Sequence, residues 1–425
     1  MNDISENTKA ILLLTAPLIV GKKAARAKIL TLKEYNTLAR SLHAQGYQPQ
    51  DLLGAEADAI LSELPAAFDS DRLSELLNRG FLLGQALNEW KRRAIWIVSR
   101  ADSTYPRQLK TRLRDQAPPI LYGCGERALL DKGGLAVVGS RKITQTLKDY
   151  TEQVGALTAT ANMPIVSGAA RGIDSSAMAG ALENGGEVIG VMADNLGRAA
   201  LAKGNRQALL DGRLVLVSAY DPSAGFNVGN AMQRNKAIYA LADAGLVVTS
   251  DFNKGGTWAG AIEQLERMHL VPVFVCNGTE SGQGSAALID HGGIPWPEPK
   301  NSQELVAALA QALDELSNET RFEQLGLKVG EDPPAYTAPP DDREKAPLKT
   351  PENKEDLSPA DQLMDAVSAI MLDLLESPTQ ADDLATTLNV SKTQVNAWLK
   401  QMLEDRQIKK LSGPVRYVSV KNRGG

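Results

Sequence analysis

The sequence has few of the residues on which disulfide frameworks, metal centres and membrane spans depend. Its 425 residues include 2 cysteines and 3 histidines, too few for a disulfide scaffold or a zinc site. No apolar run reaches the roughly 20 residues of a membrane-spanning helix, and Pro17 interrupts the short apolar stretch at residues 11–20. We therefore expect a cytoplasmic protein that uses neither metal nor cofactor and does not contact a membrane.

Aromatic side chains and positive charge are scarce as well. Aromatic residues make up 5% of the chain and the net charge is −5, so the composition gives no global sign of nucleic-acid binding. The charge is unevenly distributed: residues 1–114 hold 17 basic and 12 acidic residues (+5), whereas residues 115–325 hold 16 and 23 (−7). Any site for a polyanion must therefore be a local cluster of basic residues.

Catalytic arrangements are rare in the sequence. His43, His269 and His291 have no second metal-type ligand at a useful spacing, and neither a nucleophile elbow nor a Walker segment is present. Cys276 follows an apolar run, where a buried thiol is more common than a nucleophile. We therefore expect that the protein is not an enzyme.

Hydrophobic spacing divides the chain into four parts. Residues 1–93 have the period of helices, and residues 94–325 alternate short runs rich in valine and isoleucine with helix-length stretches. Residues 326–362 hold 7 prolines among polar and acidic residues, which predicts a linker. Residues 363–425 have helix–turn–helix spacing followed by two short strands, which is typical of a winged helix. We expect that domain to contact protein or to bind DNA weakly.

The alternation in residues 94–325 predicts the fold of the central part. The expected strands are residues 95–98, 135–138, 164–166, 188–192, 214–218, 246–249 and 271–275. Helix-length stretches between them imply a Rossmann-like, mostly parallel α/β sheet with helices on both faces. Ligands of such sheets lie at the carboxyl ends of the strands.

Two glycine-bearing segments follow expected strands in this part. The segments are VVGSRK at residues 137–142 and SGAARGID at residues 167–174. Glycine lets the backbone approach a phosphate, a helix N-terminus supplies N–H donors, and arginine adds a fork suited to phosphate oxygens. The phosphate ligands predicted from them are Ser140, Arg141, Lys142, Ser167, Gly168, Arg171 and Gly172.

Several weaker candidates accompany these loops. A carboxylate repels phosphate, so we expect Asp174 to cap the helix or to orient Arg171, with contact to a base or sugar hydroxyl as the alternative. Trp258 either stacks on a base or belongs to the core. The further candidate nucleic-acid contacts are Lys203, Arg206, Arg234, Asn235, Lys236 and Lys254. For each of them the alternative is an ordinary solvated turn or helix start.

The order of these segments resembles the DNA-processing protein A family (DprA/Smf). SGAARGIDSSAMAGAL at residues 167–182 is similar to the family signature SGLARGIDxxAHxGAL. RNK at residues 234–236 resembles the family's RNR, and DSTYP at residues 102–106 resembles its DxxYP. The resemblance extends over residues 95–296, about half of the chain. It departs from the family at Met178, which replaces a histidine, and at residues 254–258, where KGGTW replaces a serine-rich loop.

The resemblance implies a protein that binds single-stranded DNA without cleaving it. It also implies a homodimer formed through the sheet domain and a RecA-type recombinase as partner. Because the signature diverges, a second hypothesis is an antitoxin or DNA sensor of a toxin–antitoxin or phage-defence system, with a toxin as partner. A third hypothesis is a nucleotide phosphoribohydrolase, because GGTWAGAIE at residues 255–263 is similar to the PGGxGTxxE loop of such enzymes. In that case Glu263 would act on a ribosyl bond and Arg171 would hold the phosphate.

Overall fold

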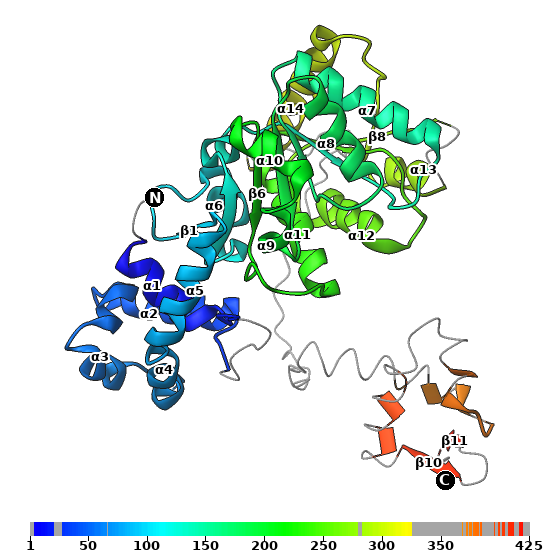
Figure 1. Ribbon diagram of the computed structural model, residues 1–425. Coiled ribbons are helices and arrows are strands. Elements are labelled where there is room, and N and C mark those ends of the chain that lie inside the picture. Colours follow the sequence, from blue (N-terminus) through cyan, green and yellow to red (C-terminus); the bar gives the residue numbers. More distant parts are fainter. Residues whose placement is uncertain are drawn as a thin grey trace, which may run out of the picture. The chain divides into compact units, whose positions relative to one another are not determined.

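The chain divides into two units, Met1–Asp332 and Pro333–Gly425 (Figure 1). The computed structural model describes residues 4–20, 28–65, 67–278 and 283–324, and single positions and short segments between residues 368 and 419. The predicted linker at residues 326–362 lies outside the described residues. Within the described part of the chain, no helix is long and apolar enough to cross a membrane.

A group of helices begins the first unit. It consists of α1 (Glu6–Thr15), α2 (Leu32–Ala44), η1 (Pro49–Leu53), α3 (Ala57–Glu63), α4 (Ser70–Leu77) and α5 (Gly80–Arg92). Residues 10–14 of α1 are at most 3% exposed, because α1 packs against η1, α4, α5 and the first strands of the sheet. At the junction, the rings of Trp90 and Tyr122 meet edge to face with their centroids 5.0 Å apart. The helical region and the sheet therefore share one hydrophobic core.

Nine strands form a single sheet in the order β1-β2-β6-β5-β4-β3-β7-β8-β9. They are β1 (Trp96–Ser99), β2 (Ile120–Gly125), β3 (Leu135–Val138), β4 (Ile165–Ser167), β5 (Val188–Met192), β6 (Leu214–Ser218), β7 (Ala244–Val247), β8 (Val273–Val275) and β9 (Ile294–Pro295). Strand β2 runs antiparallel to β1 and β6, and all the other pairs are parallel. The predicted α/β fold with a mostly parallel sheet is confirmed.

Strand β2 was not expected from the sequence. Its two glycines, Gly123 and Gly125, interrupt the apolar pattern of a strand. The structure gives the reason for the first of them, because a Cβ on Gly123 would lie 2.3 Å from the Trp96 ring. Packing against Trp96 therefore requires a glycine at this position, and that glycine weakens the strand pattern in the sequence.

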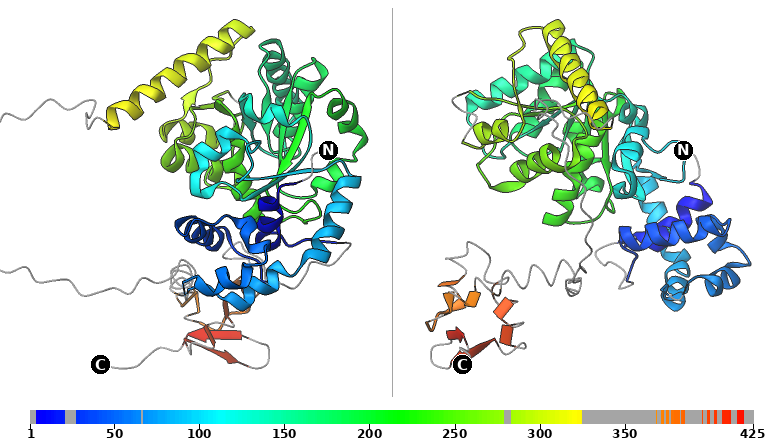
Figure 2. Two further views of the ribbon diagram at one scale, coloured as in Figure 1. Left: turned by 90° about the vertical axis from the view of Figure 1, so that its left-hand side faces the viewer. Right: turned by 180° about the vertical axis from the view of Figure 1, so that it is seen from behind.

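Helices cover both faces of the sheet (Figure 2). They are α6 (Arg107–Leu113), η2 (Arg114–Gln116), η3 (Arg127–Asp131), α7 (Gln145–Thr160), α8 (Ile173–Glu183), α9 (Leu196–Ala199), α10 (Lys203–Leu210), α11 (Val228–Leu241), α12 (Gly255–Glu263), the π-helical turn η4 (Gln264–Met268), α13 (Gln283–Asp290) and α14 (Ser302–Gln324). Successive residues of a strand point to opposite faces of the sheet and belong to two separate hydrophobic clusters. Leu135 and Val137 pack toward α7 and α8, whereas Ala136 and Val138 lie in the cluster of α6, α11 and α12.

The strand order reverses beside β3. Strands β4, β5 and β6 extend the sheet on one side of β3, and β7, β8 and β9 extend it on the other. Strand β3 leads into α7 on one face and β7 leads into α12 on the other, so the loops at their carboxyl ends separate. Open α/β sheets bind their ligands in the crevice at such a reversal.

The second unit has a small core of its own. Strands β10 (Ile408–Leu411) and β11 (Arg416–Ser419) pair as an antiparallel hairpin, and Thr379 bridges Tyr417. Trp398 packs against a cluster that includes Met371 and Leu399. Much of the expected helix–turn–helix, including residues 385–394, lies outside the described residues. The winged helix therefore stays a prediction.

Asp102 ties the N-terminal helices to the sheet. Its carboxylate accepts hydrogen bonds from the hydroxyls of Ser5, the N-cap of α1, and of Thr8 in α1, each at 2.6 Å, and from the Ser99 N–H at 2.7 Å. Partial burial by itself would raise the pKa of Asp102. These hydrogen bonds, with a further one from the Ser99 hydroxyl, stabilise the carboxylate by more than burial destabilises it, so the net effect is a lowered pKa. In the same segment, the Tyr105 hydroxyl donates to the Pro118 carbonyl at 2.8 Å. The DSTYP segment thus has a structural role.

We predict that Asp102→Asn lowers the free energy of unfolding by about 2 kcal/mol, because donors that served a carboxylate lose their charged acceptor. A lowered pKa contributes stability that is lost as the pH falls, so the difference from the unmodified protein should shrink in acid. Urea unfolding at neutral and acidic pH measures both effects. Asp58→Asn, at an exposed position of α3, is the control and should change stability by less than about 0.5 kcal/mol. An Asp102→Asn protein as stable as this control would contradict the assignment.

Candidate nucleic-acid interface

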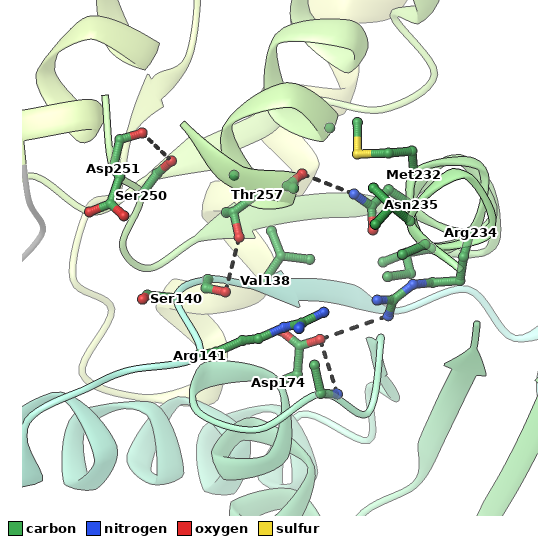
Figure 3. Close-up of a pocket in the computed structure, with 18 of the residues that line it drawn as sticks. Val138, Ser140, Arg141, Asp174, Met232, Arg234, Asn235, Ser250, Asp251 and Thr257 are labelled. Atoms are coloured by element: carbon green, nitrogen blue, oxygen red, sulfur yellow. Dashed lines mark hydrogen bonds and ion pairs between the residues drawn. The ribbon is translucent and has the colours of Figure 1, made fainter. Parts of the chain in front are cut away.

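A cavity of about 370 Å³ lies at the strand reversal beside β3 (Figure 3). Its walls come from the loop after β3, the β4–α8 loop with the start of α8, the loop after β7 with the start of α12, and one side of α11. All of these segments except α11 follow the carboxyl end of a strand. The cavity therefore lies where the topology predicts a ligand site.

The loops after β3 and β4 are locked together by close backbone packing. The Ile173 N–H donates to the Ser140 carbonyl at 3.2 Å. Gly172 has a φ of +86°, and a Cβ there would lie 2.3 Å from the Ser140 oxygen. A Cβ on Gly139 would lie 2.5 Å from the Ile173 side chain. No other residue fits at these two glycines, so the loops form one rigid rim.

Four cationic side chains are exposed on the loops around the cavity, and of these Arg141 and Lys254 line it. Arg141 and Lys142 follow β3, Arg171 follows β4, and Lys254 precedes α12. The Arg141 guanidinium lies 5.7 Å from the centre of the Phe226 ring, which is 57% exposed. The N-terminus of α12 adds backbone N–H groups at the cavity, and the Thr257 hydroxyl ties that helix to the Gly139 carbonyl at 2.9 Å. This arrangement favours binding of phosphate groups.

A buried ion pair forms the floor of the cavity. The side chains of Asp174 and Arg234 are 8% and 9% exposed, and their nearest charged atoms are 3.9 Å apart. Burial raises the pKa of Asp174 to about 6, against the opposing effects of Arg234, of backbone N–H groups and of Arg141. Figure 3 shows the Arg141 and Arg234 side chains pointing toward each other beside Asp174. The charged partner of Asp174 is therefore Arg234 of α11, and not Arg171, whose orientation was one of the roles expected for this carboxylate. The carboxylate also accepts a hydrogen bond from the Ala170 N–H at 3.4 Å.

Gly168 makes room for this pair. A Cβ at that position would lie 1.3 Å from an Arg234 guanidinium nitrogen. Arg234 also donates to the Val191 carbonyl at 3.3 Å, while its buried Nε has no hydrogen-bond partner among the described residues. The glycine after β4 thus lets an arginine of α11 reach under the loop.

Some predicted contacts are used inside the protein. The Ser167 side chain is fully buried and its hydroxyl donates to the Val137 carbonyl. Asn235 donates to the Gly256 carbonyl at 3.0 Å. Lys236 binds Gln116 at 2.9 Å and pairs with Glu263 at 3.1 Å, and it does not line the cavity. These three side chains hold elements together around the cavity.

Two further predicted contacts lie apart from the cavity. Lys203 and Arg206 are exposed on α10, which packs against β2 and β6. Neither residue lines the cavity at the strand reversal. The predicted residues that line the cavity are Ser140, Arg141, Asp174, Arg234, Asn235 and Lys254. Lys142, Ser167, Gly168, Arg171 and Gly172 belong to the loops that form it but are not among its lining residues.

The residues of the enzymatic hypothesis do not meet at the cavity. Glu263 is the last residue of α12 and pairs with Lys236, whereas Gly255 and Gly256 at the other end of that helix line the cavity. The length of α12 separates them by about 12 Å. Cys276 is 3% exposed, and burial raises its pKa to about 12, so its thiol is protonated. Among the residues described by the structure, no three His, Cys, Asp or Glu side chains cluster as metal ligands.

Sequence reasoning missed the exposed aromatic residues near the cavity. Phe226 and Phe252 are each 57% exposed, and Phe252 contacts the edge of Trp258, which is only 8% exposed and belongs to the core. Phe226 lies in the polar, glycine-containing segment DPSAGFNVGN at residues 221–230. A phenylalanine within such a polar loop has few apolar neighbours in sequence to bury it. Its exposure could therefore have been predicted from the sequence.

We predict that Asp174→Ala lowers the free energy of unfolding by about 3 kcal/mol, because it leaves the buried Arg234 charge without a partner. Arg234→Met added to this change should recover a large part of the loss, since the buried charge is then gone. Urea unfolding of the two single variants and the double variant measures the coupling. Strictly additive effects would show that the two residues are not coupled.

The profile of the family described as DNA recombination-mediator protein A matches residues 96–307. The chain is 33% identical over 213 residues to protein Smf of Escherichia coli K12, which is 48% of this chain and 55% of Smf. It is 28% identical over 251 residues to the DNA processing protein DprA of Streptococcus pneumoniae R6, which is 57% of this chain and 84% of that protein. The chain thus spans just over half the length of Smf.

A solved structure shows the same fold. The X-ray structure of DprA from S. pneumoniae aligns with 72% of this chain and 98% of its own, with a TM-score of 0.52 and 22% identity. The matched region of this chain contains the sheet, the two locked loops and the cavity. Through residues 96–307 the chain belongs to the DNA recombination-mediator protein A family, the family of DprA and Smf.

Proposed function

We propose that the protein is a non-catalytic recombination mediator whose central sheet binds single-stranded DNA at the cavity beside β3. One observation carries this proposal. Arg141 and Lys254 line the cavity, and Lys142 and Arg171 are exposed next to lining residues of the same loops, so three loops that are separate in sequence bring four cations to one region. Although the net charge of the chain is −5, these exposed positive charges lie together at the carboxyl edge of the sheet, where open α/β sheets bind their ligands.

The chemistry of the rim suits a polynucleotide backbone. Guanidinium and ammonium groups bind successive phosphates by releasing counterions, a contribution that does not depend on sequence. Phe226, which lies against Arg141, supplies a flat surface at the mouth of the cavity. Alternating cationic and aromatic groups are typical of proteins that bind single strands.

The family membership supports the choice of DNA as the ligand. The family is described as DNA recombination mediators, and the relatives are DNA-processing proteins. The proposal includes a homodimer formed through the sheet domain and a recombinase of the RecA type as partner, both of which the family resemblance implies. A recombinase partner distinguishes this function from that of an antitoxin.

We predict that Arg141→Ala combined with Arg171→Ala abolishes measurable binding of a labelled single-stranded oligonucleotide. Both side chains are exposed, so the thermal transition should hardly change. Fluorescence anisotropy at two salt concentrations measures the affinity, and any residual binding should have a salt dependence that is shallower by about one to two phosphate contacts.

Lys33→Ala combined with Arg92→Ala is the matched control. This change also removes two exposed cations, one on α2 and one on α5, and should leave the affinity unchanged. Equal affinity of the Arg141/Arg171 variant and the unmodified protein would refute the assignment of the rim. Equal losses in both double variants would mean that net charge, and not this site, governs binding.

A further inference from the structure

A second cavity, of about 710 Å³, lies between α6 and α11 on one face of the sheet. Residues 230, 233, 234, 237 and 241 of α11 line it, and their spacing places them on one face of that helix. Its other walls come from α6, from Pro118 and Pro119, and from β2, β5 and β6. Arg234 is the only residue that lines both this space and the cavity beside β3, so the proposed function leaves the second cavity without a role.

One end of the second cavity is apolar. Leu109 and Leu113 of α6, Leu121 of β2, and Ala237 and Leu241 of α11 line it, and all five are buried. Polar groups of a ligand would find no hydrogen-bond partner among these side chains. The volume lies within the range of small-molecule sites. This end therefore suits the apolar part of a small molecule.

The other end is cationic. Arg234 lies about 10 Å from Leu241 along the axis of α11, next to Val191 and Met192, where β5 ends. Among the described residues that line the second cavity, Arg234 and Lys236 are the only charged side chains, so no carboxylate faces the ligand space. A cationic end at the carboxyl ends of parallel strands favours an anionic group of the ligand.

The protein partners of Arg234 do not use all of its donors. Its side chain is more than nine-tenths buried, and its Nη1 donates to the Val191 carbonyl at 3.3 Å and faces Asp174 at 3.9 Å. The buried Nε has no hydrogen-bond partner within the described part of the chain. A guanidinium carries five N–H groups and binds a carboxylate through two of them at once. Arg234 therefore keeps donors for a second carboxylate besides Asp174.

We propose that the second cavity binds a small monocarboxylic acid whose remaining part is apolar. The carboxylate accepts hydrogen bonds from Arg234, and the apolar part lies between α6 and α11. Sugars and nucleotides do not suit this space, because the leucines and prolines of its walls would leave their polar groups unpaired. This inference goes beyond the proposed function, and its test contains no DNA, so either proposal fails without the other.

The probes are octanoate and octanamide, which have the same chain length and differ in charge. Each is titrated into the full-length protein by isothermal titration calorimetry. Octanoate should bind at a single site per chain, and octanamide at least about tenfold more weakly, because hydrogen bonds between charged groups are the stronger ones. Absence of saturable octanoate binding, or equal affinities for the two probes, would overturn the proposal.

Asp174→Ala combined with Arg234→Met tests the cationic end. This double variant removes the guanidinium together with its buried counter-charge, so neither charge is left unpaired in the interior. The preference for octanoate over octanamide should fall to about one, while octanamide still binds to the apolar walls. A full preference for octanoate in the double variant would show that Arg234 does not hold the carboxylate, which contradicts the proposed site.

Ala237→Leu tests the apolar end. The larger side chain takes up space between α6 and α11, so both probes should lose about tenfold in affinity as fewer of their methylene groups are buried. Ala307→Leu, at an exposed position of α14, is the matched control and should keep both affinities. If Ala237→Leu fails to fold, Gln233→Trp, at an exposed position on the same face of α11, covers the second cavity and is judged by the same loss. Unchanged affinities in the folded variant would overturn the proposal.

Discussion

The close approach of the loops after β3 and β4 is the constraint on which the candidate site depends. Gly139 and Gly172 allow the backbone around Ser140 to lie directly against the start of α8, and the Ile173 N–H closes the contact. Any side chain at these glycines would force the loops apart. Because the loops cannot separate, Arg141 and Arg171 stay on one rim without a ligand to hold them there, so little ordering entropy is lost on binding.

The same packing explains why a carboxylate lies inside a basic site. The bare backbone at Gly168 lets Arg234 reach under the loop, and a guanidinium at that depth needs a counter-charge, which Asp174 supplies. The pair fixes the loop from below while the exposed cations act from above. The charges of this region thus fall into two groups, one paired in the interior and one exposed at the surface.

The family signature acquires a physical meaning from these contacts. The SGAARGID segment places a glycine over Arg234, an arginine on the rim and an aspartate under it. The DSTYP segment does not line the cavity; it joins the N-terminal helices to the sheet through Asp102, and Tyr105 ties it to Pro118. One motif therefore builds the candidate site, and the other holds the helical region in place.

The sequence alone was enough to predict the α/β class, seven of the nine strands of the large sheet and the loops that carry the exposed cations, because period and glycine placement are local properties of the chain. It could not show that Ser167, Arg234 and Lys236 turn inward, since a basic or polar residue near a helix start looks the same whether its partner is solvent or a distant carboxylate. The pairings of Asp174 with Arg234 and of Lys236 with Glu263 join elements far apart in the chain. Which charges neutralise each other in the interior, and which stay exposed around the cavity, depends on how β3, β4 and α11 pack together, and no local pattern in the chain records that packing.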